Sequence, residues 1–397
     1  MKKLMVLGAS ILQLPAIQCA KSMGVQVIAV DMNPDAIGFK EPGIQREIIS
    51  TIDIPAVVAA AKKHQIDGVM TLASDMPMRT VAAVSKELGL VGVSEETAFK
   101  ATNKAAMREA LKQGGVPIPA FCKVSSTEEY LMAVKNFCGP FVVKPADNSG
   151  SRGIVLVEDL ANDRLVAEAY AYSHKYSRNG DVVVEEYMQG KEVSVETLTV
   201  DGECHVIQIT DKITTGAPHF VEMGHSQPTM QSPEIVKKIE AVAKAANRAI
   251  GISNGPSHTE IMVTEDGPKI VELGARLGGD CITSHLVPLS TGVDMVECCI
   301  RIALGETPNF TKRLNRGAAI RYFRQRKGRI ASIEGLIEAE KLPGVHQISV
   351  IHNVGEIVDD VDSSAARMGF VIAQGENAVQ AIKNCENAVS HIQVRFE

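Results

Sequence analysis

The sequence predicts an α/β protein of several units that begins with a doubly wound parallel-sheet domain. Short apolar runs occur at 4–7, 25–30, 68–72 and 90–93, and segments of helical length separate them. Strands that alternate with helices form parallel sheets with helices on both faces. The length of 397 residues allows several compact units with separate cores.

The remaining elements follow in order along the chain. A helical stretch runs from Ser94 to Gln113, and Pro117 and Pro119 mark a linker. Strands are predicted at 120–124, 141–144, 154–157, 182–186, 193–198 and 206–209, with an amphipathic helix at 233–250. The runs 261–263 and 270–273 indicate a hairpin, and a helix follows at 293–304. Beyond 316, strands at 317–323 and 371–372 and a helix at 377–390 indicate a small α+β unit.

Composition and charge exclude several classes of function. The chain has 41 Lys and Arg against 47 Asp and Glu, a net charge of −6, and no long basic run. We therefore expect neither nucleic acid nor a membrane as a partner. The eight cysteines form no CxxC pair, so we expect reduced thiols and no structural zinc site. No apolar segment approaches the roughly 20 residues of a membrane span, and we expect a cytoplasmic protein.

The turn after the first predicted strand resembles a dinucleotide-binding fingerprint only in part. Gly8 follows the strand, and Asp31 ends the next one. The segment GASILQ lacks the second and third glycines that let the backbone approach a pyrophosphate. We interpret Gly8 as a tight turn, and an NAD-dependent dehydrogenase remains an alternative.

A lysine and a loop rich in glycine and serine form the first chemical motif. Lys144 ends a predicted strand, and the loop DNSGSRG follows at 147–153. Such a loop can direct backbone N–H groups at phosphate oxygens, and a lysine beside it adds a positive charge. We predict that Lys144, Ser149, Gly150 and Ser151 bind a nucleotide phosphate. An ordinary flexible hairpin is the alternative.

The segment VEEYMQGKE at 184–192 has the pattern of an adenosine site. It combines an acidic strand end, a short apolar bend and Gly-x-Glu. Backbone groups at the bend can read the adenine edge, and a carboxylate can accept hydrogen bonds from ribose hydroxyls. We predict nucleotide contacts from Glu185, Glu186, Met188 and Glu192. A charged strand end without a ligand is the alternative.

Two glutamates on neighbouring predicted strands form the third motif. Glu260 lies in SHTE, and Glu272 lies in VELGAR, which ends at Arg276. A glutamate in an apolar strand costs desolvation unless it is paired or binds a cation. Two such carboxylates can hold Mg²⁺ against substrate phosphates. Arg276, followed by Gly278 and Gly279, can stabilise an oxyanion or an acyl phosphate.

These motifs, in this order and spacing, resemble the ATP-grasp superfamily over residues 1–310. The resemblance implies an ATP-grasp fold with an N-terminal doubly wound domain at 1–94. It further implies a linker helix and lid subdomain at 95–188, a catalytic subdomain at 189–314 and a small C-terminal domain at 315–397. The cofactors that it implies are ATP and Mg²⁺, with Mn²⁺ as a substitute.

The same resemblance implies roles for individual residues. Lys104 and Lys144 resemble the nucleotide lysines of the family, Glu185 and Met188 its adenine contacts, and Glu192 its ribose ligand. Glu260 and Glu272 resemble the Mg²⁺ ligands, and Arg276 resembles the catalytic arginine, which acts with Lys144. Many members place Asn two residues after the second glutamate. Here that position is Gly274, so the resemblance supports one Mg²⁺ better than two.

A narrower resemblance concerns the substrate. The segment from Asp211 to His225 is similar to the substrate segment of the L-amino-acid ligases, which join amino acids into dipeptides. The C-terminal motifs RYF, LPGV and RMGFVIAQG are similar to their C-terminal domain. We expect Glu222 to pair with a substrate ammonium and His225 to contact a carboxylate or phosphate. Exposed loop residues are the alternative, and a homodimer is a family-level expectation.

The predicted function is that of an ATP-dependent carboxylate–amine ligase. A carboxylate attacks the γ-phosphate of ATP, and an amine then attacks the acyl phosphate, so that ADP and phosphate are released. The predicted partners are therefore a small-molecule acid and a small-molecule amine. The alternatives are an ATP-grasp carboxylase or formyl-activating enzyme of the purine type, and a non-catalytic nucleotide-binding protein.

Overall fold

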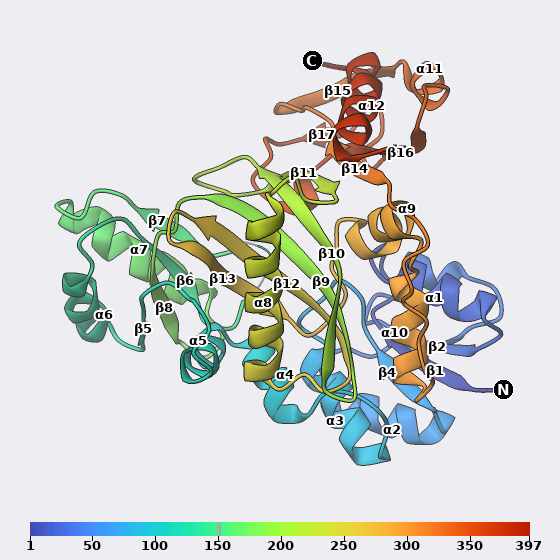
Figure 1. Ribbon diagram of the computed structural model, residues 1–397, viewed down its shortest axis with the longest axis horizontal. Helices are drawn as coiled ribbons and strands as arrows, with labels where there is room; N and C mark the ends of the chain where they lie inside the picture. Colours follow the sequence, from blue (N-terminus) through green and yellow to red (C-terminus); the bar gives the residue numbers. More distant parts are fainter. Residues whose placement is uncertain (149, 151) are drawn as a thin grey trace.

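The structure, a computed structural model, describes residues 1–148, 150 and 152–397 (Figure 1). The predicted phosphate-binding residues Ser149 and Ser151 therefore lie outside the described residues. In the part of the chain that is described, no helix is long and apolar enough to cross a membrane. The eight cysteines, all within that part, are free.

The N-terminal sheet is parallel, as predicted. Its strand order is β3 (Gln45–Glu47), β2 (Gln26–Val30), β1 (Lys3–Leu7) and β4 (Gly68–Met70). The prediction of a strand at 90–93 is wrong. That segment caps helix α3 (Met78–Leu88) instead, because the Leu90 N–H donates to the Ser85 carbonyl. The fourth strand is β3, whose sequence QRE has no apolar residue that would indicate a strand.

Helices cover both faces of this sheet, and one of them comes from much later in the chain. Met5 and Leu7 point to the face packed by α2 (Ile54–His64) and α3. Leu4 and Val6 point to the face packed by α1 (Leu14–Ser22) and α10 (Met295–Ala303). The packing of α10 joins the N-terminal sheet to the centre of the molecule (Figure 1).

A larger sheet forms the centre of the molecule and continues into the C-terminal part. Its order is β13 (Gly267–Gly274), β12 (Gly255–Thr264), β9 (Lys191–Val200), β10 (Glu203–Thr214), β11 (Glu222–Gln227), β14 (Gly317–Tyr322), β18 (Gly369–Gly375) and β16 (Val345–Val350). The predicted hairpin is β12–β13, and the predicted helix at 233–250 is α8 (Pro233–Ile250). Val193 and Val195 pack with α8, so alternate residues of β9 point to the opposite face.

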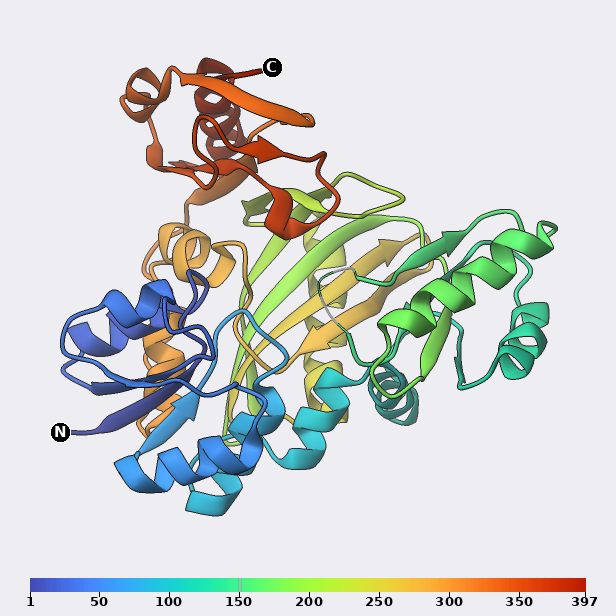
Figure 2. The same ribbon diagram turned by 180° about the vertical axis from the view of Figure 1, so that it is seen from behind.

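The third sheet belongs to a small unit beside the central sheet. Its order is β5 (Phe121–Val124), β8 (Val182–Glu186), β6 (Phe141–Pro145) and β7 (Val155–Val157). Helices α6 (Thr127–Ala133) and α7 (Asp163–Tyr176) complete this unit. The predicted helical stretch that leads to it is two helices, α4 (Glu95–Thr102) and α5 (Lys104–Gln113), because Asn103 caps the second. Figure 2 shows this unit and the N-terminal domain on opposite sides of the central sheet.

The C-terminal part adds a sheet of β17 (Ile357–Val358), β15 (Gly328–Glu334) and β19 (Gln393–Phe396). Its helices are α11 (Leu336–Glu340) and α12 (Ala378–His391), the latter as predicted. The short helices η1 (Ile37–Lys40), η2 (Val134–Asn136), η3 (Ile282–Leu286), α9 (Val287–Thr291) and η4 (Ser364–Ala366) connect the larger elements.

Candidate active site

The register of the central sheet places the two predicted metal ligands on the face opposite α8. Glu260 of β12 is directly opposite Glu272 of β13, and His258 is directly opposite Glu196 of β9. Directly opposed residues of an antiparallel pair point to the same face. The two predicted metal ligands therefore lie side by side. The two sequence motifs do not by themselves predict this, because they do not give the register of the strands.

A buried ion triad lies where α5 meets β6 and β8. Arg108 Nε and Nη2 donate to the two carboxylate oxygens of Glu185 at 2.7 and 3.0 Å. Lys144 Nζ lies 2.5 Å from Glu185 Oε2. Burial raises the pKa of Glu185, but Arg108 and Lys144 outweigh it and lower the pKa to about 2. Glu185 therefore stays ionised and holds Lys144 in place.

Lys104 connects the glycine-rich loop to the predicted metal site. It is the first residue of α5, and its Nζ donates to the Asn148 carbonyl at 2.7 Å and to Glu272 Oε1 at 2.9 Å. Burial lowers the pKa of Lys104, but the Glu272 carboxylate outweighs burial, so the pKa is raised. Gly150 has a φ of +69°, and a Cβ added there would meet no atom of the described residues within 4 Å, so conformation favours glycine at this point of the loop.

The segment after β8 approaches the central sheet closely. A Cβ at Gly190 would lie 2.2 Å from the Val263 carbonyl oxygen of β12, so only glycine fits there. Met188 is half-buried and Glu186 is exposed. The Glu186 carboxylate accepts a hydrogen bond from the Ala120 N–H at 3.2 Å and so ties β8 to the linker.

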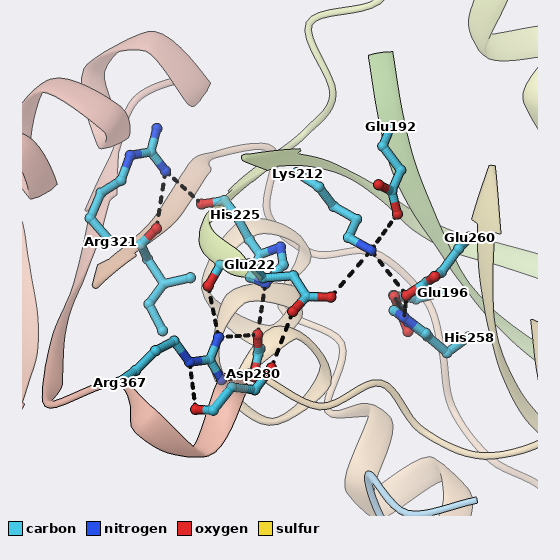
Figure 3. Close-up of polar contacts among 12 residues, drawn as sticks. Glu192, Glu196, Lys212, Glu222, His225, His258, Glu260, Asp280, Arg321 and Arg367 are labelled. Carbon is cyan, nitrogen blue, oxygen red and sulfur yellow. Dashed lines mark hydrogen bonds and ion pairs between the residues drawn. The ribbon is translucent and has the colours of Figure 1, made fainter. Parts of the chain in front are cut away.

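Lys212 of β10 is the centre of the cluster in Figure 3. Its Nζ lies 2.5 Å from Glu192, 3.0 Å from Glu260 and 3.6 Å from Glu222. Burial lowers the pKa of Lys212, but the three carboxylates outweigh it and raise the pKa well above its ordinary value. Lys212 therefore joins the predicted ribose ligand, a predicted metal ligand and the predicted ammonium site.

The pair of His258 and Glu196 lies beside Glu260. His258 Nδ1 lies 2.7 Å from Glu196 Oε1, and His258 Nε2 lies 3.5 Å from Glu260 Oε1. Burial lowers the pKa of His258, but Glu196 raises it to about 9, so the imidazole carries a charge. A Cβ at Gly278 would lie 2.7 Å from His258 Nδ1, and therefore glycine at 278 leaves room for this pair.

The expected catalytic arginine is held from the N-terminal domain. Arg276 Nε and Nη2 donate to the two oxygens of Asp75 at 2.8 and 3.0 Å. Burial lowers the pKa of Arg276, but Asp75 outweighs it and raises the pKa. Gly279 lies three residues further, where a Cβ would meet only Ala73 Cβ at 3.4 Å.

The C-terminal domain contributes Arg367 to the substrate side of the cluster (Figure 3). Arg367 makes two hydrogen bonds of 2.7 Å to Asp280 and one of 3.0 Å to the Glu222 carbonyl. His225 Nε2 lies 3.1 Å from Asp280 Oδ2, and the ring is 1% exposed. Burial raises the pKa of Asp280, but Arg367 and His225 outweigh it and lower the pKa. The structure thus encloses His225, and its Nδ1 has no hydrogen-bond partner among the described residues.

The donor set fits Mg²⁺ bound together with a substrate phosphate. Among the described residues, no group of three His, Cys, Asp or Glu side chains converges on one ion. Mg²⁺ takes one or two carboxylates and completes its shell with phosphates and water, so Glu260 and Glu272 suffice. The three carboxylates around Lys212 leave a surplus of negative charge that a divalent cation would neutralise.

The N-terminal turn does not have the form of a dinucleotide site. Asp31 accepts a hydrogen bond from the Ala9 N–H at 2.8 Å. A Cβ at Gly8 would lie 2.7 Å from the Gln13 side chain, which fills the space above the turn. Gln13 Nε2 in turn donates to the Leu72 carbonyl at 2.6 Å and so supports the loop after β4.

Comparison with known proteins identifies the family. The model of the ATP-grasp domain matches residues 137–284, and that of L-amino acid ligase C-terminal domain 2 matches residues 321–397. The chain contains an ATP-grasp domain. Its ATP-grasp fold was predicted and is confirmed.

Individual relatives of this ATP-grasp protein are also ligases. It is 29% identical over 299 residues to the L-arginine-specific L-amino acid ligase of Bacillus subtilis. The matched region covers 74% of this chain and 72% of the relative. The L-amino acid ligase of Bacillus licheniformis superposes with a TM-score of 0.86 at 22% identity, over 100% of this chain and 99% of that chain. Phosphoribosylglycinamide synthetase of Anaerococcus prevotii superposes with a TM-score of 0.81 at 20% identity, over 100% of both chains. The protein is an ATP-grasp ligase that forms carbon–nitrogen bonds.

Sequence reasoning missed several residues that the structure places in the cluster. They are Asp75, Arg108, Glu196, Lys212 and Arg367. Lys212 has the clearest local signal, because it is a charged residue in an otherwise half-buried strand. The partners of Asp75 and Arg367 lie 201 and 87 residues away, so no local pattern indicates them.

Proposed function

We propose that this ATP-grasp ligase activates a small carboxylic acid, such as an amino acid, as an acyl phosphate and joins it to an amine. The products are the amide, ADP and phosphate. The observation that carries the proposal is the position of Lys212 among Glu192, Glu222 and Glu260. One ammonium there connects the nucleotide end of the cluster with its substrate end.

The nucleotide end has the charges that phosphoryl transfer requires. We assign Lys144 and Lys104 to the phosphates, and we propose Ser149, Gly150 and Ser151 as further phosphate contacts. Glu185 holds Lys144 through its carboxylate. We propose adenine contacts from the chain at Glu185 and Met188, a further nucleotide contact from Glu186 and a ribose contact from Glu192. Catalysis of phosphoryl transfer depends mainly on positioning and charge neutralisation, and this arrangement supplies both.

Glu260 and Glu272 would hold Mg²⁺, which neutralises charge on the transferred phosphoryl group when it is bound. Until then Lys212 and Lys104 balance these two carboxylates, at 3.0 and 2.9 Å. Arg276, with the backbone at Gly278 and Gly279, faces the developing negative charge of the acyl phosphate. The acyl oxygen bonds to phosphorus as the bond to ADP breaks, and phosphate leaves when the amine attacks.

The substrate end is acidic, which suits an ammonium. Glu222 is half-buried, accepts a hydrogen bond from Ser364 at 3.2 Å and lies 3.6 Å from Lys212. We propose that it pairs with the ammonium of an amino acid and that His225 contacts the substrate carboxylate or its phosphate. The relative from Bacillus subtilis is specific for L-arginine, and we extend only the amino-acid class to this chain.

A phosphate-release screen of amino-acid pairs with ATP and Mg²⁺ tests the proposal. We expect phosphate release that requires both an acid and an amine, together with ADP and a product of the mass of the amide. Glu222→Gln should raise the KM for the amino acid, whereas Glu203→Gln, at an exposed glutamate of β10, should not. Release of AMP and pyrophosphate would refute the mechanism. Turnover with bicarbonate or formate that is insensitive to Glu222→Gln would favour a carboxylase or formyl-activating enzyme.

Two further expectations stay proposals. We propose that the units at 1–94, 95–188, 189–314 and 315–397 act as domains, which limited proteolysis tests by the positions of its first cuts. We also propose a homodimer, for which light scattering on the purified chain should give twice the mass of 42.6 kDa. A mass equal to that of one chain would refute the dimer.

A further inference from the structure

Asp75 of the N-terminal domain occupies the space beside Gly274. At position 274 the ATP-grasp pattern often has Asn, and here it is Gly274. A Cβ at Gly274 would lie 2.8 Å from Asp75 Oδ1 and 3.1 Å from Arg276 Nε. Gly274 is not among the glycines with positive φ, so its backbone does not require glycine. Glycine is required at 274 because the Asp75–Arg276 pair occupies the space that a side chain would need.

We propose that Asp75 is a positioning residue for Arg276 and that Gly274 provides the room for it. The inference rests on the proposed function, in which Arg276 stabilises the acyl phosphate. The pair is bidentate at 2.8 and 3.0 Å, and both side chains are about one-sixth exposed, at 16% and 15%. A carboxylate that grips both nitrogens fixes the plane of the guanidinium. Without it, Arg276 would be free to turn toward the nearby carboxylates of Glu260 and Glu272.

The loop that carries Asp75 is held by the backbone of the loop that carries Arg276. Leu72 and Leu277 form an isolated parallel bridge, and the Ala73 N–H donates to the Leu277 carbonyl at 3.2 Å. Ala73 has a φ of +60°, a conformation that costs a non-glycine residue energy and persists only where its surroundings impose it. The bridge therefore fixes the approach of Asp75 to Arg276.

A second contact supports the same loop from below. Gln13 Nε2 donates to the Leu72 carbonyl at 2.6 Å and to Ser74 Oγ at 3.1 Å. Gly8, where a Cβ would lie 2.7 Å from this side chain, leaves room for Gln13. The N-terminal turn that resembles a dinucleotide motif thus supports the loop that holds Arg276. The N-terminal domain takes part in the reaction through this contact.

The test uses the full-length protein with Asp75→Ala, Asp75→Asn, Gly274→Ala and the double variant Asp75→Ala/Gly274→Asn. Asp67→Asn is the matched control, because Asp67 precedes β4 as Asp75 follows it, and among the described residues its carboxylate accepts only a surface hydrogen bond from the Lys3 N–H. We expect Asp75→Ala to lower kcat on the order of 100-fold, since small misplacements of a catalytic group have this effect. The KM for ATP should change by less than about threefold, because the lost interaction acts in the transition state.

The two positions should also be coupled. Gly274→Ala pushes the pair apart and should lower kcat, whereas the Asn of the double variant enters the space that Asp75 leaves and accepts from Arg276. The double variant should therefore be more active than Asp75→Ala alone. Equal kcat for Asp75→Ala and the wild type, or a double variant that is no more active than Asp75→Ala alone, would overturn the proposal.

A chemical readout separates this inference from the proposed function. Phenylglyoxal modifies accessible arginines, and peptide mapping reports the rate at Arg276. We expect faster modification of Arg276 in Asp75→Ala and Asp75→Asn than in the wild type and Asp67→Asn, with unchanged circular dichroism. Unchanged labelling of Arg276 would overturn the positioning role. Failure to find amide formation would refute the proposed function, and the labelling result would stand independently of it.

Discussion

Replacement of Glu185 by Gln tests the buried triad that holds Lys144. Glu185 accepts two hydrogen bonds from Arg108 and one contact from Lys144, and all three side chains are less than one-tenth exposed, at 4%, 2% and 9%. Glu185→Gln leaves two buried cations without a counter-charge, which costs about 3–5 kcal/mol. Burial raises the pKa of Glu185, but the arginine and lysine outweigh it and lower the pKa to about 2, so the folded protein favours the ionised form, while burial lowers the pKa of Lys144.

The pH dependence of stability shows in which direction the Glu185 carboxylate acts. Because the folded protein lowers the pKa of Glu185, its stabilisation is complete above pH 4.5 and is lost as the pH falls toward about 2. Urea denaturation followed by circular dichroism suits a chain without Trp. We expect the difference in unfolding free energy between wild type and Glu185→Gln to be constant from pH 7 to pH 5 and to shrink below it. Glu186→Gln, at an exposed neighbour, should change stability by less than about 0.5 kcal/mol. If the two variants are equally stable, or if the gap widens in acid, the triad is not held as described.

Three further variants test other parts of the site. Lys212→Met should abolish measurable turnover. It also leaves three carboxylates without their lysine, so the protein should bind Mn²⁺ more tightly in the absence of nucleotide, as measured by electron paramagnetic resonance. Weaker binding of Mn²⁺ would contradict the charge argument. Glu272→Gln should weaken binding of Mn²⁺ with ADP about tenfold or more, as loss of a metal ligand predicts, and an unchanged affinity by calorimetry would remove Glu272 from the metal site. Arg367→Ala frees Asp280 and the Glu222 carbonyl and should raise the KM for the amino acid more than that for ATP; equal effects on both would argue against a role of the C-terminal domain at the substrate.

The parts of the fold that the sequence predicted have strong local signals. Strand β8 was predicted with its observed bounds because VVVEE is a continuous apolar run with an acidic end. Helix α8 has Ser232 as a cap, Pro233 in its first turn and Gly251 in the left-handed region at its end. Strand β3 has no such signal, and neither does the change of direction at 90–93.

The site divides in the same way. Motifs within a few residues, such as Lys144 with its loop, can be recognised locally. The pairs His258–Glu196 and Arg276–Asp75 join residues that are 62 and 201 positions apart, so only the folded chain reveals them. Gly274 illustrates the difference, because its meaning depends on a side chain of another domain. The sequence therefore predicted the ATP-grasp fold and named candidate ligand-facing residues, but it did not indicate the residues that hold those candidates in position.

Transfer of oxygen from the acid to phosphate tests the central claim most directly. A substrate carboxylate labelled with a heavy oxygen isotope attacks the γ-phosphate in the proposed mechanism, so the oxygen that bridges acyl carbon and phosphorus leaves with phosphate. Mass spectrometry of the products should find the label in inorganic phosphate and in the amide, with none in ADP. Label in AMP, or phosphate without label, would contradict an acyl-phosphate intermediate.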